Sequence, residues 1–253
     1  MVSAPTIPFS EDVETTQAFL EALDAQAMLR WGIDTFGTGF ALTTSFGIQS
    51  AVLLHMSSEL GHAAGLTLPA SGIPVIWVDT GYLPAETYRY AEQLRSRLRI
   101  DLHVAQAELS PARMEALHGR LWETGQLGDL ELYHRLRKVE PLDRALTDLG
   151  VRCWASGVRG SQTDHRKAMQ VLDRVRDRWS LRPLLTWTSK DIYYYMQRHD
   201  LPQHPLFDQG YSTVGDWHSS APDDGGLSGR ATRFGGLKQE CGIHLPGLMG
   251  EGI

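Results

Sequence analysis

The residue with the greatest chemical reactivity is Cys241, in the segment ECGIH that spans residues 240–244 near the C-terminus. Positive charge nearby lowers the pKa of a thiol, and the thiolate is the form that acts as a nucleophile. Four basic residues lie within a dozen positions of Cys241 in the sequence: Arg230, Arg233, Lys238 and His244. We therefore expect an accessible, activated cysteine at this position.

A zinc site is the alternative for this segment, because Cys241 and His244 have the spacing of a Cys-x-x-His half-site. A closed zinc site needs two more ligands, and only Cys153 could supply a second sulfur. Cys153 stands in the middle of an expected strand beside Trp154, which indicates a small buried side chain. We therefore expect no metal at Cys241.

Three polar clusters follow expected strands. Residues 45–50 (SFGIQS) form a strand-to-helix turn whose backbone N–H groups could face an anion, although a plain turn explains them equally well. Residues 79–82 (DTGY) could receive the base or ribose of a nucleotide, yet capping of the next helix alone would explain them. Residues 157–166 (GVRGSQTDHR) contain two arginines, which suit phosphate, with a solvated loop as the alternative.

Strand and helix patterns alternate from residue 40 to about residue 199, which predicts an α/β fold with a mainly parallel sheet. Ligands of such sheets bind just beyond the carboxyl ends of the strands, where the three clusters stand. We expect strands at residues 41–45, 73–79, 100–104, 152–158 and 181–185, and helices at residues 17–31, 51–60, 84–98 and 188–199.

We expect one domain over residues 1–253, made of three parts. Residues 1–38 form a helical N-terminal extension, residues 39–207 the nucleotide-binding core, and residues 208–253 a flexible, mobile tail that carries Cys241. Eleven of the last 46 residues are glycine, and no apolar period continues into them. The tail therefore has the composition of a mobile segment rather than of a packed element.

The composition is that of a globular protein, with 42% hydrophobic and 21% charged residues. The net charge of −6 leaves no basic field for nucleic acid or for a membrane surface. The longest uncharged run, residues 35–58, is too polar for a membrane span, and the N-terminus lacks the pattern of a signal peptide. Two cysteines in total favour a reducing compartment, so we expect a cytoplasmic protein.

Five segments together resemble the assimilatory adenylyl-sulfate and phosphoadenylyl-sulfate reductases. They are TTSFGIQSA at 43–51, VDTGYLPAETY at 78–88, RKVEPLDRAL at 137–146, GYSTVGDWH at 210–218, and ECGIH. The resemblance implies a Rossmann-like adenine-nucleotide α-hydrolase fold, related to the PP-loop ATPases. Those ATPases hold pyrophosphate with Ser-Gly-Gly-x-Asp-Ser. Phe46 and Gln49 replace a glycine and the acid here, which favours a sulfonucleotide over cleavage of ATP.

The family divides by iron–sulfur content. Members that use adenylyl sulfate carry Cys-Cys before RKVEPL and Cys-x-x-Cys after GYSTVG, and these cysteines bind a [4Fe–4S] cluster. The equivalent places here are residues 133–134 (YH) and 216–219 (DWHS). Two cysteines cannot supply four ligands, so the resemblance is to the cluster-free branch, whose usual substrate is 3′-phosphoadenylyl sulfate.

The resemblance implies a two-step reaction in sulfate assimilation and cysteine biosynthesis. Cys241 attacks the sulfonate sulfur and expels adenosine 3′,5′-bisphosphate, leaving an S-sulfocysteine. Thioredoxin or glutaredoxin then releases sulfite, and no bound cofactor is needed. The family often forms homodimers. Three alternatives stay open: an adenylyl-sulfate reductase without a cluster, a PP-loop enzyme that adenylates with ATP, and a nucleotide-binding regulatory module with a redox-sensing tail.

The resemblance and the strand ends together assign the site residues. Positive charge for the phosphosulfate comes from Lys138, Arg230, Arg233 and His244. Substrate-binding positions are Ser45, Phe46, Gly47 and Ser50 on the phosphate side, Asp79, Thr80 and Gly81 around the adenosine, and Gly157 and Arg159 in the arginine loop. Arg166 and Lys167 are candidates to contact a 3′-phosphate. Glu240 has no evident role, because an anion beside a thiolate opposes its activation.

Overall fold

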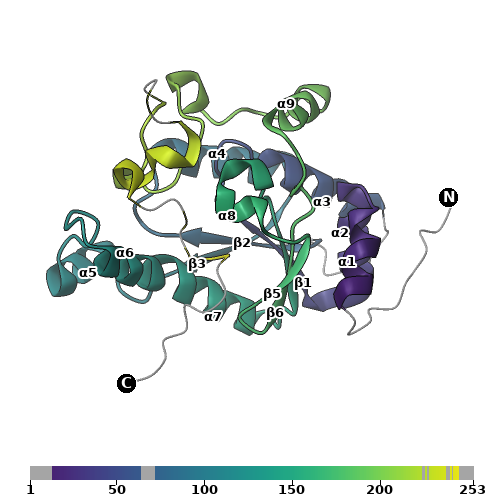
Figure 1. The fold of residues 1–253 in the computed structure, drawn as a ribbon, viewed down its shortest axis with the longest axis horizontal. Coiled ribbons are helices and arrows are strands. Elements are labelled where there is room, and N and C mark those ends of the chain that lie inside the picture. The colour runs from purple at the N-terminus through teal and green to yellow at the C-terminus, as the bar shows by residue number, and fades with distance from the viewer. Residues whose placement is uncertain are drawn as a thin grey trace.

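A computed structural model describes residues 13–63, 72–223, 226, 228–237, 240 and 242–244. Within these ranges, no helix combines the length and the apolar character that a membrane crossing requires. The described elements form a sheet with helices on both faces (Figure 1).

The sheet in the described part of the chain has six strands in the order β3-β2-β1-β4-β6-β5. Every neighbouring pair is parallel except β5 and β6, which are antiparallel at one edge. The α/β fold with a mainly parallel sheet is therefore confirmed. The strands are β1 (Phe40–Thr44), β2 (Pro74–Asp79), β3 (Asp101–Gln106), β4 (Cys153–Ser156), β5 (Leu172–Val175) and β6 (Arg178–Leu181).

Alternate residues of the central strands face two separate apolar clusters, as the pleat of a strand requires. Leu42, Val75 and Cys153 point into a large cluster with helices α2, α3, α4 and α9. Ala41 and Trp154 point to the other side, where α7 covers the sheet. Figure 1 shows α4 and α9 above the strands and α7 below them. These helices are α2 (Ala25–Phe36), α3 (Ala51–Ala63), α4 (Ala85–Leu98), α7 (Glu140–Asp148) and α9 (Ser189–Arg198).

Two expectations for individual elements were wrong. The helix expected at residues 17–31 is two helices, α1 (Val13–Glu21) and α2, because the Asp24 carboxylate accepts a hydrogen bond from the Ala27 N–H at 2.8 Å and begins a new helix. The strand expected at residues 181–185 lies earlier, as β6, and pairs with the unexpected edge strand β5.

A helical region between β3 and β4 was not expected from the sequence. It comprises α5 (Pro111–His118), α6 (Leu127–His134), a π-helical turn (Arg135–Val139) and α7. The π turn inserts a residue into the helical register, and such insertions are frequent at functional sites. This turn carries Lys138, so the local irregularity of the helix sets the position of that side chain.

His204 is a fully buried imidazole whose hydrogen bonds require the neutral form. The Leu206 N–H donates to Nδ1 at 3.1 Å, so the proton is on Nε2, which lies 3.1 Å from the Thr87 hydroxyl oxygen. Burial lowers the pKa of His204 to about 4. Protonation of Nδ1 would break the bond from Leu206.

We expect the free energy of unfolding to fall as the pH decreases from about 6.5, the ordinary imidazole pKa, towards 4. In that window the unfolded chain takes up a proton at His204 that the folded chain does not. Urea titrations at pH 7, 6 and 5 measure the slope, which should be shallower in His204→Gln. Equal slopes in the two proteins would show that His204 is not the source.

Candidate active site

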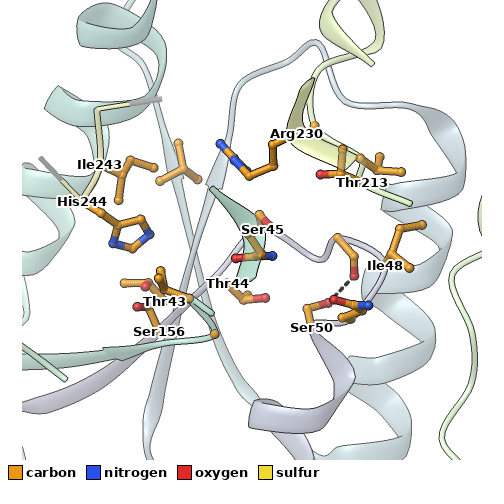
Figure 2. Close-up of a pocket in the computed structure, with 18 of the residues that line it drawn as sticks. Thr43, Thr44, Ser45, Ile48, Ser50, Ser156, Thr213, Arg230, Ile243 and His244 are labelled. Carbon is orange, nitrogen blue, oxygen red and sulfur yellow. Dashed lines mark hydrogen bonds between the residues drawn. The ribbon is translucent and has the colours of Figure 1, made fainter. Parts of the chain in front are cut away.

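A cavity of about 230 Å³ lies at the carboxyl ends of β1, β2 and β4. The loop after β4, residues 212–216 and the C-terminal segment complete its walls. Figure 2 shows Arg230 extending above Ser45, with His244 over Thr43 and Ser156. Ten residues assigned from the sequence line it: Ser45, Gly47, Ser50, Thr80, Lys138, Gly157, Arg159, Arg230, Arg233 and His244.

Phe46 was also assigned to substrate, but its side chain packs in the core. It is fully buried and meets the ring of Trp77 edge to face, with 5.0 Å between the ring centroids. Phe46 has a left-handed φ of 45°, a conformation that is uncommon for an aromatic residue. This backbone turn carries the side chain away from the cavity while its neighbours Ser45 and Gly47 face it.

Asp79 and Gly81 shape the turn after β2 and do not line the cavity. The Asp79 carboxylate accepts hydrogen bonds from the Gly81 N–H at 2.8 Å, the Tyr88 hydroxyl at 2.6 Å and the Gln106 amide at 2.8 Å. Gly81 has a φ of +74°, and a Cβ there would lie 2.6 Å from Cγ of Pro111. The two residues therefore hold the turn, and the turn presents Thr80 to the cavity.

Cys241 and Lys238 lie outside the described residues. The residues on both sides of Cys241 in the sequence are described, and Glu240, Ile243 and His244 line the cavity. Ile243 also packs against the apolar cluster beneath α7. Residues that precede and follow Cys241 in the sequence therefore line the same cavity.

Lys138 forms a short ion pair with Asp216, with 2.6 Å between Nζ and Oδ2. The Asp216 side chain is fully buried, and its Oδ1 accepts a hydrogen bond from the Thr80 hydroxyl at 2.5 Å. Burial alone would raise the pKa of Asp216, but the ammonium of Lys138 and the two hydrogen bonds hold it well below its usual range. Lys138 is therefore a charged group in a fixed position, partly neutralised by its partner.

Tyr133 and Asp216 stand at two of the places where cluster-binding members of the resembled family carry cysteines, and Tyr133 belongs to an aromatic group with His218 and Trp122. The His218 ring stacks on Trp122 with 4.2 Å between centroids, and its Nε2 lies 3.0 Å from the Tyr133 hydroxyl. Burial lowers the pKa of His218 to about 4. These side chains and Asp216 are committed to one another, so they do not fit a cluster held by thiolates.

The Glu240 carboxylate contacts two arginine side chains and a threonine hydroxyl. Nε and Nη2 of Arg166 donate to its two carboxylate oxygens at 2.9 Å each, and the Thr163 hydroxyl donates at 2.9 Å. Nη2 of Arg230 lies 3.5 Å from the same carboxylate. Burial would raise the pKa of Glu240, but the guanidinium groups of Arg230 and Arg166 lower it. Glu240 thus ties the C-terminal segment to the loop after β4.

Among the described residues, five cationic side chains and two carboxylates line the cavity, which gives a net charge of +3. Burial and then Arg166 lower the pKa of Arg159 to about 10, so it stays protonated near pH 7. Such a field suits a ligand with several negative charges. The cations are Lys138, Arg159, Arg166, Arg230 and Arg233, and the carboxylates are Asp216 and Glu240.

The structure corrects the expected charge of His244. Its Nδ1 is buried without a hydrogen-bond partner among the described residues. The low pKa that burial and the neighbouring guanidinium groups give this imidazole favours its neutral form over the expected cation. Burial, then the guanidinium groups of Arg166, Arg182, Arg230 and Arg176, lower the pKa of His244 well below 6.5.

Three residues of the site have partners that the sequence patterns do not indicate. Asp216 stands within the GYSTVGDWH segment, which marks its neighbourhood but not its pairing with Lys138. Arg166 is marked only as a candidate for a 3′-phosphate, and Glu240 has no expected role. The GYSTVGDWH motif could have drawn attention to Asp216. No motif connects the two segments that the Arg166–Glu240 ion pair joins.

Comparison with known proteins gives three consistent results. Residues 39–222 match the model of the phosphoadenosine phosphosulfate reductase domain. The chain is 54% identical over 224 residues to a phosphoadenosine 5′-phosphosulfate reductase from Synechococcus sp., covering 87% of this chain and 92% of that protein. It is 48% identical to a protein of the same name from Synechocystis sp., covering 93% of this chain and 91% of that protein.

Solved structures agree with this relationship. A phosphoadenylyl-sulfate reductase from Candida auris, solved as a phosphate complex, superposes with a TM-score of 0.69 at 29% identity, over 86% of this chain and all of that chain. An FMN adenylyltransferase from Candida glabrata shares the fold alone, with a TM-score of 0.60 at 13% identity, over 88% of this chain and 71% of that chain. The chain therefore belongs to the phosphoadenosine phosphosulfate reductase domain family.

Proposed function

We propose that this protein reduces 3′-phosphoadenylyl sulfate to sulfite and adenosine 3′,5′-bisphosphate in sulfate assimilation and cysteine biosynthesis. The cavity carries the proposal, because it has a net charge of +3 at the strand ends where nucleotides bind in such sheets. Relatives up to 54% identical bear the name of this reductase. The residues on either side of Cys241 in the sequence line the same cavity.

In the first half-reaction, the Cys241 thiolate attacks the sulfonate sulfur. A bond forms between the cysteine sulfur and the sulfonate sulfur, and the bond from that sulfur to the phosphate oxygen breaks. The electron pair leaves with adenosine 3′,5′-bisphosphate, and the product on the enzyme is an S-sulfocysteine. Both reactants are anionic, so the step depends on positive charge directed at the phosphosulfate.

Different lining residues bind different parts of the substrate. Lys138, Arg230 and Arg233 supply positive charge along the phosphosulfate. His244 offers its neutral imidazole as a hydrogen-bonding group, consistent with the unpartnered Nδ1. The polar groups at the strand ends hold the nucleotide: Ser45, Gly47 and Ser50 on the phosphate side, Thr80 towards the adenosine, and Gly157 and Arg159 in the arginine loop.

The second half-reaction uses an external dithiol, thioredoxin or glutaredoxin. Its thiolate attacks the sulfur of Cys241, sulfite leaves, and the second cysteine of the partner resolves the mixed disulfide. Cys153 is a poor substitute for that partner, because it is fully buried in β4 and burial raises its pKa well above the usual value. The reaction then belongs in a reducing cytoplasm, with residues 208–253 bringing the nucleophile to the core at residues 39–207. The part of this segment around Val214 and Asp216 is buried against the core rather than mobile.

The committed side chains at Tyr133, Asp216 and His218 support the substrate choice. Tyr133 and Asp216 stand at two of the places of the cluster ligands in relatives that use adenylyl sulfate, and His218 lies between the two places at 216 and 219. We therefore propose the 3′-phosphorylated nucleotide as substrate and no iron–sulfur cluster. The test is sulfite release coupled to NADPH oxidation through thioredoxin reductase and thioredoxin, with each nucleotide in turn.

We expect one sulfite per NADPH with 3′-phosphoadenylyl sulfate and much slower release with adenylyl sulfate. Pyrophosphate from ATP would instead identify an adenylating enzyme. Binding of nucleotide without any release of sulfite would identify a regulatory module. Either of these two results would contradict the proposed function.

A further inference from the structure

Buried hydrogen-bond donors gather on one face of the sheet, outside the walls of the candidate active-site cavity. Trp154 of β4 and Ser180 of β6 are neighbours in the ladder, and Asp173 of β5 lies next to Ser180. Neighbouring residues of adjacent strands point to the same face, so all three share the side where Trp154 packs. Nε1 of Trp154 and Oγ of Ser180 are buried, and neither has a hydrogen-bond partner among the described residues.

Two arginines belong to the same group. Arg182 is fully buried, and its Nη1 donates to the Gln170 carbonyl at 2.7 Å. Within the part of the chain that the structure describes, its Nε and Nη2 have no partner. The Arg176 guanidinium lies over the Trp154 ring, 5.9 Å from the centroid, and only 4% of this side chain is exposed. Its Nη2 is also buried without an acceptor in the described ranges.

The partner that these donors require is a negatively charged acceptor. A guanidinium group and an indole N–H only donate, and buried donors in folded proteins are almost always satisfied by protein, water or an ion. Arg176 is neutralised by Asp143, with 2.8 Å between Nε and Oδ1. Asp173 lies 3.7 Å from Arg182 and its side chain is 43% exposed, so it compensates Arg182 only weakly. One buried positive charge therefore stays largely uncompensated.

We propose that this group of donors is the binding site of one small monovalent anion of the size of chloride. Its ligands are Arg176, Arg182, the Ser180 hydroxyl and the Trp154 indole N–H. A single negative charge balances the uncompensated guanidinium, and burial among packed side chains favours a small ion over a polyatomic one. The site is separate from the active-site cavity, so the proposal does not depend on the proposed function.

An open groove of about 650 Å³ connects Arg176 with solvent. Among the described residues, four arginines and two aspartates line this groove, which gives it a net charge of +2. A positively charged groove raises the local concentration of anions. It therefore serves as the route by which the ion reaches the buried donors. The charged lining residues are Arg152, Arg174, Arg176, Arg178, Asp143 and Asp177.

Anomalous diffraction locates the ion directly. Crystals are grown with sodium bromide in place of sodium chloride, and with adenosine 3′,5′-bisphosphate to occupy the cationic active-site cavity. We expect an anomalous peak from bromide in contact with Arg176 and Arg182. Density at this place without an anomalous signal would identify an ordered water and would overturn the proposal. The peak is judged by its place alone, so a failure of the nucleotide to bind leaves the test intact.

Thermal unfolding measures the same binding in solution. Chloride replaces gluconate stepwise at constant ionic strength, because gluconate is too large for a buried site of this kind. We expect the Tm to rise along a one-site saturation curve, by about 2–4 °C once chloride reaches about five times its Kd. The rise should vanish in Arg182→Met, which keeps the length of the side chain and removes its charge. Ser180→Ala removes one ligand and should weaken the apparent Kd several-fold.

The variants also predict an opposite effect in gluconate. Without its anion, Arg182 is a buried charge without compensation, so Arg182→Met should have a higher Tm than the unmodified protein there. Arg97→Gln is the matched control, because it removes an exposed ion pair with Asp200 and should keep the full rise with chloride. An equal rise in Arg182→Met and the unmodified protein would overturn the proposal, and so would the absence of a rise in the unmodified protein.

Discussion

Replacing Cys241 with serine is expected to reduce sulfite release by on the order of 10⁴-fold or more, the scale of loss when a covalent nucleophile is removed. A serine hydroxyl stays protonated near pH 7 and is a weak nucleophile without an adjacent base. It also cannot form the sulfur–sulfur bond that the dithiol partner cleaves. The NADPH-coupled assay with thioredoxin measures the effect.

Cys153→Ala is the matched control for this substitution, because Cys153 is buried in β4 and does not line the cavity. We expect it to keep its activity, with at most a loss of stability from the shortened side chain. Binding of adenosine 3′,5′-bisphosphate by Cys241→Ser checks that the site is intact. Sulfite release by Cys241→Ser at the unmodified rate would contradict the mechanism.

Asp216→Asn is expected to lower the free energy of unfolding by about 3–5 kcal/mol, since it leaves the Lys138 ammonium without its buried partner. Asparagine keeps the shape of the side chain and can still accept the hydrogen bond from Thr80. Urea unfolding measures the loss. Activity should fall too, because Lys138, which we propose as a source of positive charge for the phosphosulfate, is no longer held in place in the cavity.

A double variant, Asp216→Asn with Lys138→Met, removes both charges. It should regain part of the stability, because an uncharged pair avoids the unpaired ammonium, but it should not regain activity.

The lowered pKa of Asp216 also predicts a pH dependence of the free energy of unfolding. The ionised Asp216 carboxylate contributes its full stabilisation of the folded state above about pH 4, the ordinary carboxyl pKa. This stabilisation is lost as the pH falls further. A stability of Asp216→Asn equal to that of the unmodified protein would contradict this account.

The strand pattern was predictable because burial imposes it locally. Residues 74–79 (PVIWVD) form an apolar run ended by an acid, and the run is β2. The polar residues that follow such runs gather at one edge of a parallel sheet, so the place of the cavity follows from the order of elements. The direction of each side chain does not follow, and Asp79 and Phe46 point away from the cavity for this reason.

The sequence did not predict the helices between β3 and β4, because their hydrophobic period is irregular. The π turn at Arg135–Val139 shifts the register between α6 and α7, which interrupts the 3.6-residue period that identifies a helix. The pairs Lys138–Asp216 and Arg166–Glu240 join segments far apart in the sequence. No local pattern encodes such a contact, so the roles of Asp216 and Glu240 required the fold.

The most direct test of the central claim is intact mass spectrometry of the reduced protein, mixed separately with adenylyl sulfate and with 3′-phosphoadenylyl sulfate. No thiol reductant is present, so the intermediate accumulates. We predict a sulfo adduct that maps to Cys241 and forms only with the 3′-phosphorylated nucleotide. An adduct with both nucleotides would keep the mechanism and contradict the substrate choice. The absence of an adduct with either nucleotide would contradict the mechanism itself.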